Sequence, residues 1–419
     1  MKKFMYFLPI AALAMASCSN DDSPVQSVQE QLSGLTDQLV LRPTIQGAST
    51  RVVQAYSNGD NSFKEFYLTA TGNFRDNESS TAADLQIVHN IDDFVTNQDG
   101  SSWLLKSGKS YWWNDSDTKG TFTGYAPKTE VEAAVADYTE INNDRSKQID
   151  YILAYNEGLK ADFRAGVPLR FRHTTSQIAI QALNKDVTKV NITVKAARMV
   201  NIMSTGKLSL PTVSTADGFD WANYTPWNIQ GDKMLTYSSF DGATSIPSSV
   251  VPLAMNGTAQ SILFGDNQYL LPQQLTPATV KDEYKDAAFT WDEDVVGHAI
   301  AFLIKVVDPS KDSDSDPNNY YIYPLATSPG ITTANPITSA YAWAYVPVNT
   351  NWEPGKKYIY TINFAKDAYG KVDPNQEPDG TPDPADPKEP GDDIVDTAVP
   401  LTFDVSIVDW EEVNEAVNP

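Results

Sequence analysis

The chain is poor in the residues that build catalytic and metal sites. Among its 419 residues there is a single cysteine, Cys18, and only three histidines, His89, His173 and His298. A zinc site or a histidine-activated nucleophile needs at least two such groups to converge. No glycine-rich phosphate loop precedes a helical pattern. The sequence therefore predicts a protein that is not an enzyme and that holds no metal or cofactor.

Basic residues are scarce as well. The chain has 31 Lys and Arg residues against 54 Asp and Glu residues, a net charge of −23. Nucleic acids and anionic lipid headgroups bind basic surfaces that displace counterions, so this balance argues against nucleic acid as a partner. The acids leave a glycosidase-type carboxylate pair open, for instance around Trp291–Asp294, but at this acid content such proximity is expected by chance.

Long hydrophobic runs are missing. The run Phe4–Ala16 follows the basic start Met1–Lys3 and is too short to span a bilayer. The small residues Ala16 and Ser17 then precede Cys18. This arrangement resembles a lipoprotein signal peptide over residues 1–17, after whose cleavage Cys18 is acylated and begins the mature chain. The alternative for a lone cysteine is a free thiol or an intermolecular disulfide.

The mature chain is more acidic still. Removing residues 1–17 takes away two of the 31 basic residues and none of the 54 acidic ones, which leaves 29 basic residues and a net charge of −25. Residues 18–37 are rich in Ser, Gln and Asp and predict a tether above the membrane. Acyl chains on Cys18 would anchor the protein by about 0.8 kcal/mol per buried methylene, without a transmembrane helix.

Beyond the tether, alternation of apolar and polar residues predicts β-strands. The alternating runs are Gln38–Arg42, Glu65–Ala70, Gln177–Gln181, Lys189–Val194 and Tyr358–Phe364. Glycine-containing turns separate them. One helix is predicted over Glu130–Tyr138, with Thr129 as its N-cap. The fold class is therefore all-β with minor helical decorations, and strands of this length and spacing build β-sandwiches.

Breaks in the strand pattern divide the chain. Glycine and proline interrupt it at residues 157–167, which predicts an N-terminal domain over 38–160 and a C-terminal domain over 161–419. Residues 371–393 contain six prolines and eight acids and predict an extended loop, because they cannot bury enough apolar surface. A closing strand follows at 401–407, with its four apolar residues on one face.

Aromatic and turn segments spread over the mature chain carry a family resemblance. They are Thr50–Arg51, Phe66–Ala70, Tyr111–Trp113, Phe122–Pro127, Asp150–Ala154, Leu169–His173, Tyr269–Gln273, Trp352–Tyr358 and Asp409–Trp410. In order and spacing they resemble the fimbrillin-like lipoproteins of Bacteroidetes, the subunits of type V pili. The resemblance implies two tandem transthyretin-like β-sandwich domains and a structural or adhesive role in a surface fibre.

The resemblance also implies a route of assembly. In the family, a surface-exposed lipoprotein precursor is cut after an arginine beyond its first strand, and a strand from another subunit fills the emptied groove. Arg51 is the residue we expect to be cut, because Arg42 is followed by Pro43. The strand 401–408 is the expected donor. An acidic pair close behind Cys18 is similar to the family's signal for export to the outer face of the outer membrane.

Three further candidate sites are supported by weaker sequence signals. Tyr111, Trp112 and Trp113 could form an aromatic platform for sugar rings, although strand alternation would turn Trp112 away from the other two. Asp-Thr-Ala at Thr397 resembles a short acceptor motif for O-glycosylation. The alternating aspartates of 308–319 offer oxygen ligands for Ca²⁺ but lack the glycine and terminal glutamate of a known calcium loop, so a solvated turn is the favoured interpretation.

The sequence as a whole predicts a subunit of a cell-surface fimbria that serves in adhesion or biofilm formation. Its expected partners are other fimbrial subunits, the outer membrane through the lipid before maturation, and a host or bacterial surface ligand. Its location is the cell surface, first as an outer-membrane lipid-anchored precursor and then in the fimbrium. The alternative is a surface lipoprotein that never polymerises and binds glycans or host ligands.

Overall fold

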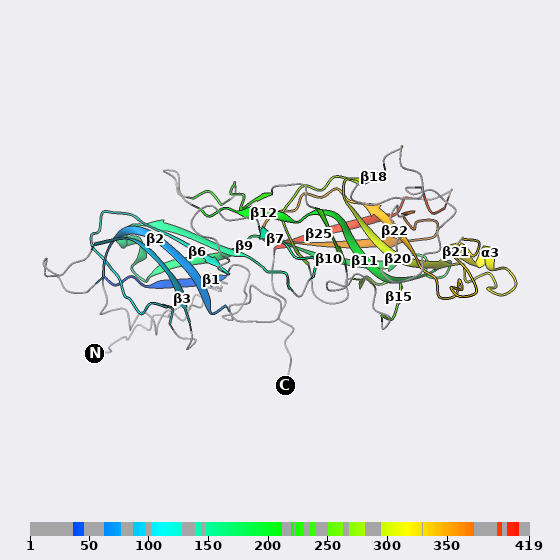
Figure 1. The fold of residues 1–419 in the computed structure, drawn as a ribbon, viewed down its shortest axis with the longest axis horizontal. Coiled ribbons are helices and arrows are strands. Elements are labelled where there is room, and N and C mark those ends of the chain that lie inside the picture. Colours follow the sequence, from blue (N-terminus) through cyan, green and yellow to red (C-terminus); the bar gives the residue numbers. More distant parts are fainter. Residues whose placement is uncertain are drawn as a thin grey trace, which may run out of the picture.

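The computed structural model describes residues 37–45, 63–76, 87–97, 102–127, 139–144, 147–211, 219–221, 223–229, 234–238, 250–262, 268–280, 295–328, 330–372, 392–395 and 400–409. Cys18, Arg51 and Thr397 lie outside these residues, as does the helix predicted over Glu130–Tyr138. The described part forms two β-rich lobes that lie end to end (Figure 1). It is all-β, as predicted, with one short 3-10 helix and one short α-helix as decorations.

The first lobe is built on one eight-stranded sheet. Its strands are β1 (Leu41–Ile45), β2 (Glu65–Arg75), β3 (Ile87–Thr96), β4 (Leu104–Leu105), β5 (Trp112–Trp113), β6 (Gly120–Ala126), β8 (Ile152–Gly158) and β9 (Val167–His173), with the 3-10 helix η2 at Lys160–Phe163. They run in the order β1-β9-β8-β6-β2-β3-β4, and β5 pairs with β2. The sheet thus continues beyond residue 160, because β9 pairs with both β8 and β1.

Alternation in β2 builds the core of this lobe. Phe66, Leu68 and Ala70 are buried, whereas the residues between them are half-buried, as the period of two predicts. The ring of Phe66 lies 4.9 Å from that of Phe171 on β9 in an edge-on contact. Gly124 on β6 faces this pair, and a Cβ there would meet the Phe171 ring at 2.7 Å. A glycine is therefore needed where the aromatic rings cross β6.

The second lobe is a sandwich of two sheets. The first contains β10 (Ser176–Asn184), β16 (Gln260–Ser261), β17 (Gln268–Leu270), β23 (Lys356–Phe364) and β25 (Thr402–Asp409). The second contains β11 (Asn191–Met203), β14 (Met234–Ser238), β15 (Leu253–Ala254), β20 (Ala299–Val307), β21 (Tyr321–Tyr323), β22 (Ala342–Pro347) and β24 (Lys371–Val372). Their main orders are β16-β10-β23-β25 and β14-β11-β20-β22-β24.

Smaller pieces complete the lobe. They are β7 (Thr139–Glu140), β12 (Thr205–Leu208), β13 (Trp227–Ile229), β18 (Thr279–Val280), β19 (Val295–Val296) and the helix α3 (Pro317–Tyr320). The main core lies between the two large sheets, where Ile180 and Tyr360 from one sheet meet Phe302 and Ile304 from the other. The strands predicted over 177–181, 189–194 and 358–364 are confirmed.

The closing strand β25 lies at a sheet edge. It pairs only with β23 among the described strands, in antiparallel register from Thr402 to Asp409. Phe403 and Val405 pack against the main core, but Ile407 is 55% exposed. The four apolar residues alternate along the strand as predicted, and Ile407 is exposed because the core ends before that residue. The loop expected at 371–393 starts with β24 in the second sheet, and residues 373–391 lie outside the described residues.

Candidate functional site

The N-terminal strand β1 is held at the edge of the first sheet. It runs parallel to β9, with Leu41 opposite Val167 and Pro43 opposite Leu169. Proline has no backbone N–H, and strands tolerate it at sheet edges where no donor is needed. The side chains of Leu41 and Pro43 are buried, and Leu41 belongs to the core of the first lobe. The sequence thus suits β1 to an edge whose apolar face closes that core.

The residues just before β1 bind a second edge of the same lobe. The N–H of Leu39 donates to the carbonyl oxygen of Tyr111 at 2.7 Å, and the N–H of Trp113 donates to that of Asp37 at 2.9 Å. Gln38 bridges Trp112 in antiparallel fashion. We call residues 37–45 the N-terminal segment. It spans from β5 to β9 and satisfies backbone groups on both.

Charges hold the start of this segment. The Asp37 carboxylate lies 3.2 Å from the guanidinium of Arg75 on β2 and also pairs with the ammonium of Lys160. Arg75 is 14% exposed and Asp37 is 38% exposed. Partial burial makes such a three-membered cluster more valuable than an isolated surface pair. The segment is thus anchored at its N-terminal end by charge and along its length by backbone pairing.

A glycine allows the close approach of β1 to β9. Gly166 has a φ of +100° and lies directly before β9. A Cβ at this position would meet the carbonyl oxygen of Val40 at 3.0 Å, and that oxygen accepts the N–H of Val167 at 2.7 Å. Both the backbone conformation and the space favour glycine here.

The three aromatics of the predicted sugar platform lie beside the N-terminal segment. Tyr111 and Trp113 are 8% and 5% exposed and belong to the core of the first lobe, whereas Trp112 is half-buried. Trp113 stacks on Phe163 at a ring distance of 6.1 Å. Alternation thus directs Trp112 away from its neighbours, and a flat exposed platform of all three rings is not formed, because the core takes two of them.

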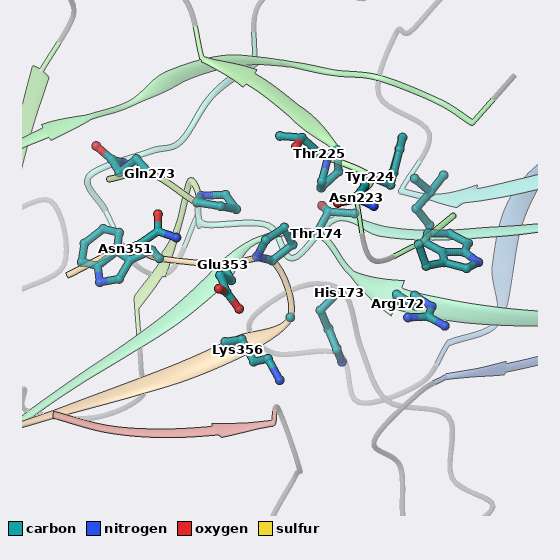
Figure 2. A pocket seen from close by; sticks show the side chains of 17 residues that line it. Arg172, His173, Thr174, Asn223, Tyr224, Thr225, Gln273, Asn351, Glu353 and Lys356 are labelled. Carbon is teal, nitrogen blue, oxygen red and sulfur yellow. The ribbon is translucent and has the colours of Figure 1, made fainter. Parts of the chain in front are cut away.

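A cavity of about 660 Å³ opens where the two lobes meet (Figure 2). Its lining includes Arg172 and His173 from the end of β9, Asn223 and Tyr224 from the second lobe, and Glu353 and Lys356 near the start of β23. Cationic, anionic and neutral polar residues therefore line one space. Sequence reasoning missed this cavity, because its lining residues are separated by up to 203 positions, from Leu153 to Lys356.

His173 is fixed below this cavity by a buried partner. Its Nδ1 lies 2.6 Å from Oδ2 of Asp150, and Oδ1 of Asp150 accepts the Thr175 hydroxyl at 3.2 Å. The side chains of His173 and Asp150 are 9% and 3% exposed. His173 is therefore a packing residue whose ring has a buried polar partner.

Two aromatic residues, Phe219 and Trp221, contact the first lobe from the second. The Phe219 ring lies 4.8 Å from that of Tyr155 on β8, and the guanidinium of Arg172 lies 4.6 Å from the Trp221 ring centroid. Thr123 on β6 donates its hydroxyl to the carbonyl oxygen of Pro211 at 3.2 Å. Pro211, Phe219 and Trp221 thus pack on the outer face of the first sheet. Two aromatics within three residues, Phe219 and Trp221, were the available sequence signal.

The acidic loop 308–319 closes on itself. Asp308 accepts the N–H of Ser310, and Asp312 accepts those of Asp314 and Ser315. The hydroxyl and then the N–H of Ser310 lower the pKa of the Asp308 carboxyl. The N–H groups of Ser315 and Asp314 lower the pKa of the Asp312 carboxyl. Turn capping therefore uses the oxygens that a cation would need. Among the described residues, no three His, Cys, Asp or Glu side chains are grouped to hold a metal.

Nothing in the described helices could serve as a membrane span, since none is both long and apolar enough to cross a bilayer.

Comparisons with known proteins identify the family of the chain. The described part is an all-β protein in which the first strand, β1, pairs along the edge of the first sheet. The profile of the Fimbrillin-like family matches residues 50–379. The chain therefore belongs to the fimbrillin-like family, as the sequence resemblance predicts. No curated protein matches significantly.

Solved structures give more distant likenesses. A fimbrial protein from Bacteroides vulgatus is 11% identical with a TM-score of 0.44, covering 89% of this chain and 99% of that chain. A protein assigned to cell adhesion from Parabacteroides distasonis is 11% identical with a TM-score of 0.40, covering 90% and 99%. A fimbrial assembly protein from the same species is 7% identical with a TM-score of 0.30, covering 78% and 92%.

Proposed function

We propose that this protein is a structural or adhesive subunit of a cell-surface fimbria. It is exported as a lipoprotein acylated at Cys18, matured by cleavage after Arg51 and assembled by strand exchange with other subunits. Before maturation the lipid holds it at the outer membrane, and afterwards it is part of the fimbrium. Membership of the fimbrillin-like family supports the structural role.

The N-terminal segment carries this proposal. It bonds to β5 on one side and β9 on the other, and its connection to the next described residue, Phe63, runs through residues 46–62. Arg51 lies within that connection. A cut there frees β1 from the rest of the chain while leaving the other strands of the lobe continuous.

Loss of the segment would uncover surface that only another strand can cover. Val167, Leu169 and Phe171 on β9 are 0% exposed while β1 is present. Their backbone and the carbonyl of Tyr111 would lose their partners together. Unpaired backbone groups beside an apolar face are a template for an added strand. The proposed groove therefore has both specificity from side-chain pockets and affinity from main-chain bonds.

The donor in this proposal is β25. It lies at a sheet edge, its inward side chains Phe403 and Val405 are only half-buried, and Ile407 and Val408 are exposed. A strand with little buried surface is released from its own sheet at lower cost than a core strand. The acidic residues that follow it are poor candidates for filling an apolar groove.

The test is the mass and N-terminal sequence of the chain recovered from the cell surface. Wild-type protein should begin at Val52 and form SDS-resistant ladders. Arg51→Ala should retain acylated Cys18 and form no ladder, whereas the control Arg42→Ala, whose scissile bond would precede a proline, should behave as wild type. Acylated Cys18 at the start of the wild-type chain would overturn the maturation step.

A second candidate function is favoured by the cavity between the lobes. A surface lipoprotein that does not polymerise could bind a glycan or host ligand there, since aromatic, amide and charged groups converge in a space of ligand size. Trp221→Ala should then abolish binding on a glycan array. Trp112→Ala tests the half-buried ring of the predicted platform in the same assay, and binding that survives both changes would contradict this function.

O-glycosylation at Thr397 remains part of the proposal. A glycan mass on the peptide that contains Thr397, absent from Thr397→Ala, is the expected result.

A further inference from the structure

Two lysines from neighbouring strands converge on one tyrosine of the second lobe. Lys195 on β11 and Lys305 on β20 place their Nζ atoms 5.5 and 4.5 Å from the centroid of the Tyr341 ring. Tyr341 directly precedes β22, which pairs with β20 on the side opposite β11. Three adjacent strands thus build one cluster of two cations and an aromatic ring.

The sheet directs these lysines away from the main core. On β20, Ile304 and Val306 face the core between the sheets, whereas Leu303 belongs to a separate cluster on the opposite face. Lys305 alternates with the core residues and so lies on that opposite face. On β11 the register with β20 shifts between Val194 and Ala196, so Lys195 is the extra residue of a β-bulge. Bulges of this kind redirect a side chain.

The position of Lys305 is costly for a charge. It lies within the otherwise apolar strand Ala299–Val307, which occupies the centre of the sheet order β14-β11-β20-β22-β24. Its ammonium donates to the carbonyl oxygen of Thr338 at 2.6 Å. A buried charge is normally compensated by an opposite charge.

No acidic side chain among the described residues forms an ion pair with either lysine, although the chain has 54 Asp and Glu residues. Burial, and next the charge of Lys195, lower the pKa of Lys305 to about 8. Burial also lowers the pKa of Lys195. Two cations at one tyrosine ring, without an acidic partner among the described residues, favour an anion beside them.

A third cation adds to the potential of this face. The guanidinium of Arg198 lies 3.9 Å from the ring centroid of Trp343, a residue of the same cluster as Leu303. Arg198 is 5% exposed, so it contributes charge rather than a contact for a ligand. The half-buried Lys195, Lys305 and Tyr341 are the groups that a ligand can reach.

We propose that Lys195 and Lys305 bind one oxyanion beside Tyr341, a sulfate or carboxylate group carried by an otherwise neutral sugar residue. Two ammonium groups match a single oxyanion through charge-assisted hydrogen bonds. The net charge of −23 repels densely charged polymers, which selects a ligand with isolated charges. The proposal deepens the adhesive role proposed above, but binding does not depend on cleavage or polymerisation.

Calorimetric titration of the uncleaved mature chain at low salt tests the site. Glucose 6-sulfate or glucuronate should bind saturably, and glucose should not. Lys195→Met and Lys305→Met should each weaken binding by about tenfold, the loss expected for one charge-assisted hydrogen bond. Lys189→Met, which removes an exposed lysine paired with Asp186 at 3.7 Å, should leave binding unchanged.

Several results would overturn the site. They are no saturable binding of either acid sugar, equal binding of glucose, or an equal loss in Lys189→Met, which would indicate a general effect of charge. Circular dichroism verifies folding of each variant, and Lys195→Met keeps the test intact if Lys305→Met does not fold. Failure of the proposed assembly would appear instead in the Arg51 experiment, which these lysines should not affect.

Discussion

The carboxylate of Asp37 lies 3.2 Å from the guanidinium of Arg75, so a residue before the first strand is tied to the end of β2. Lys160 joins the same carboxylate from the helix that precedes β9. The N-terminal segment is therefore clamped at one end while its other end continues into the connection that contains Arg51. This arrangement would hold the segment in place in the proposed uncut precursor.

Removal of this clamp should loosen the segment without unfolding the lobe. We expect Asp37→Ala to lower the free energy of unfolding by about 1 kcal/mol, because the pairs are partly exposed. Urea unfolding measures this loss, and limited proteolysis should cut the N-terminal segment faster. Asp117→Ala, which removes an exposed carboxylate outside the described ion pairs, is the control. Equal proteolysis of the two variants would show that the clamp does not hold the segment.

Substitution of Gly166 by alanine should destabilise the protein more than the same substitution at Gly108, another glycine with positive φ. Gly166→Ala and Gly108→Ala both place a Cβ at positive φ, +100° and +74°, at a cost of about 1 kcal/mol each. Only the first meets a backbone atom, since nothing lies within 4 Å of a Cβ at Gly108. We expect a larger fall in melting temperature for Gly166→Ala. Equal melting temperatures would contradict the close contact with Val40.

The buried pair of Asp150 and His173 should contribute more to the free energy of unfolding than a surface ion pair does. Asp150→Ala removes the carboxylate that Nδ1 of His173 contacts and that accepts the Thr175 hydroxyl, and both side chains are buried or nearly so. The expected loss of stability is about 3 kcal/mol, typical of breaking one partner from a buried polar pair. Denaturant unfolding measures it. A loss below that of Asp37→Ala would rule out the proposed importance of the pair.

Lys305 should make stability depend on pH in the alkaline range. Its pKa is about 8 in the folded chain and 10.5 without the fold, because burial and Lys195 disfavour the charged form. Between these values the unfolded chain binds more protons, so stability should rise as the pH is raised from about 8 to 10.5. Lys305→Met should flatten this part of the profile, and Lys189→Met should not. Identical profiles for wild type and Lys305→Met would contradict the perturbed lysine.

The exposed end of β25 should matter for assembly more than for folding. Ile407 and Val408 are 55% and 44% exposed, so changing both to Ser should alter the free energy of unfolding by less than about 1 kcal/mol. The same change should reduce SDS-resistant ladders of the chain that begins at Val52. Val187→Ser, at a residue that is 46% exposed, is the control. Unchanged ladders in the double variant would show that this end of β25 is not part of the donor strand.

Local patterns predicted local structure well. The period of two in Glu65–Ala70 gave both the strand and its buried face, because a sheet with one face on a core fixes which residues point inward. The same rule placed Trp112 opposite Tyr111 and Trp113. It did not predict the exposure of Ile407, since alternation tells which face a residue takes but not where the core beneath that face ends.

Long-range pairing could not be predicted. Nothing in residues 37–39 indicates that they bond to Tyr111 and Trp113, because backbone groups carry no sequence signal. Trp221 contacts Arg172 across the lobe junction. Lys195 and Lys305, 110 positions apart, both approach the ring of Tyr341. Each of these contacts depends on strand order and register, which many residues set together.

The sequence by itself determined the acidic character, the all-β class and the family of this protein, since composition, alternation and aromatic spacing are local properties that survive without coordinates. Only the tertiary structure decided that the N-terminal segment contacts both β5 and β9, that the cavity lies between the lobes, and that two lysines share one tyrosine. Those features arise where distant strands meet, and the free energy of packing a whole lobe, rather than the preference of any one segment, selects which strands become neighbours.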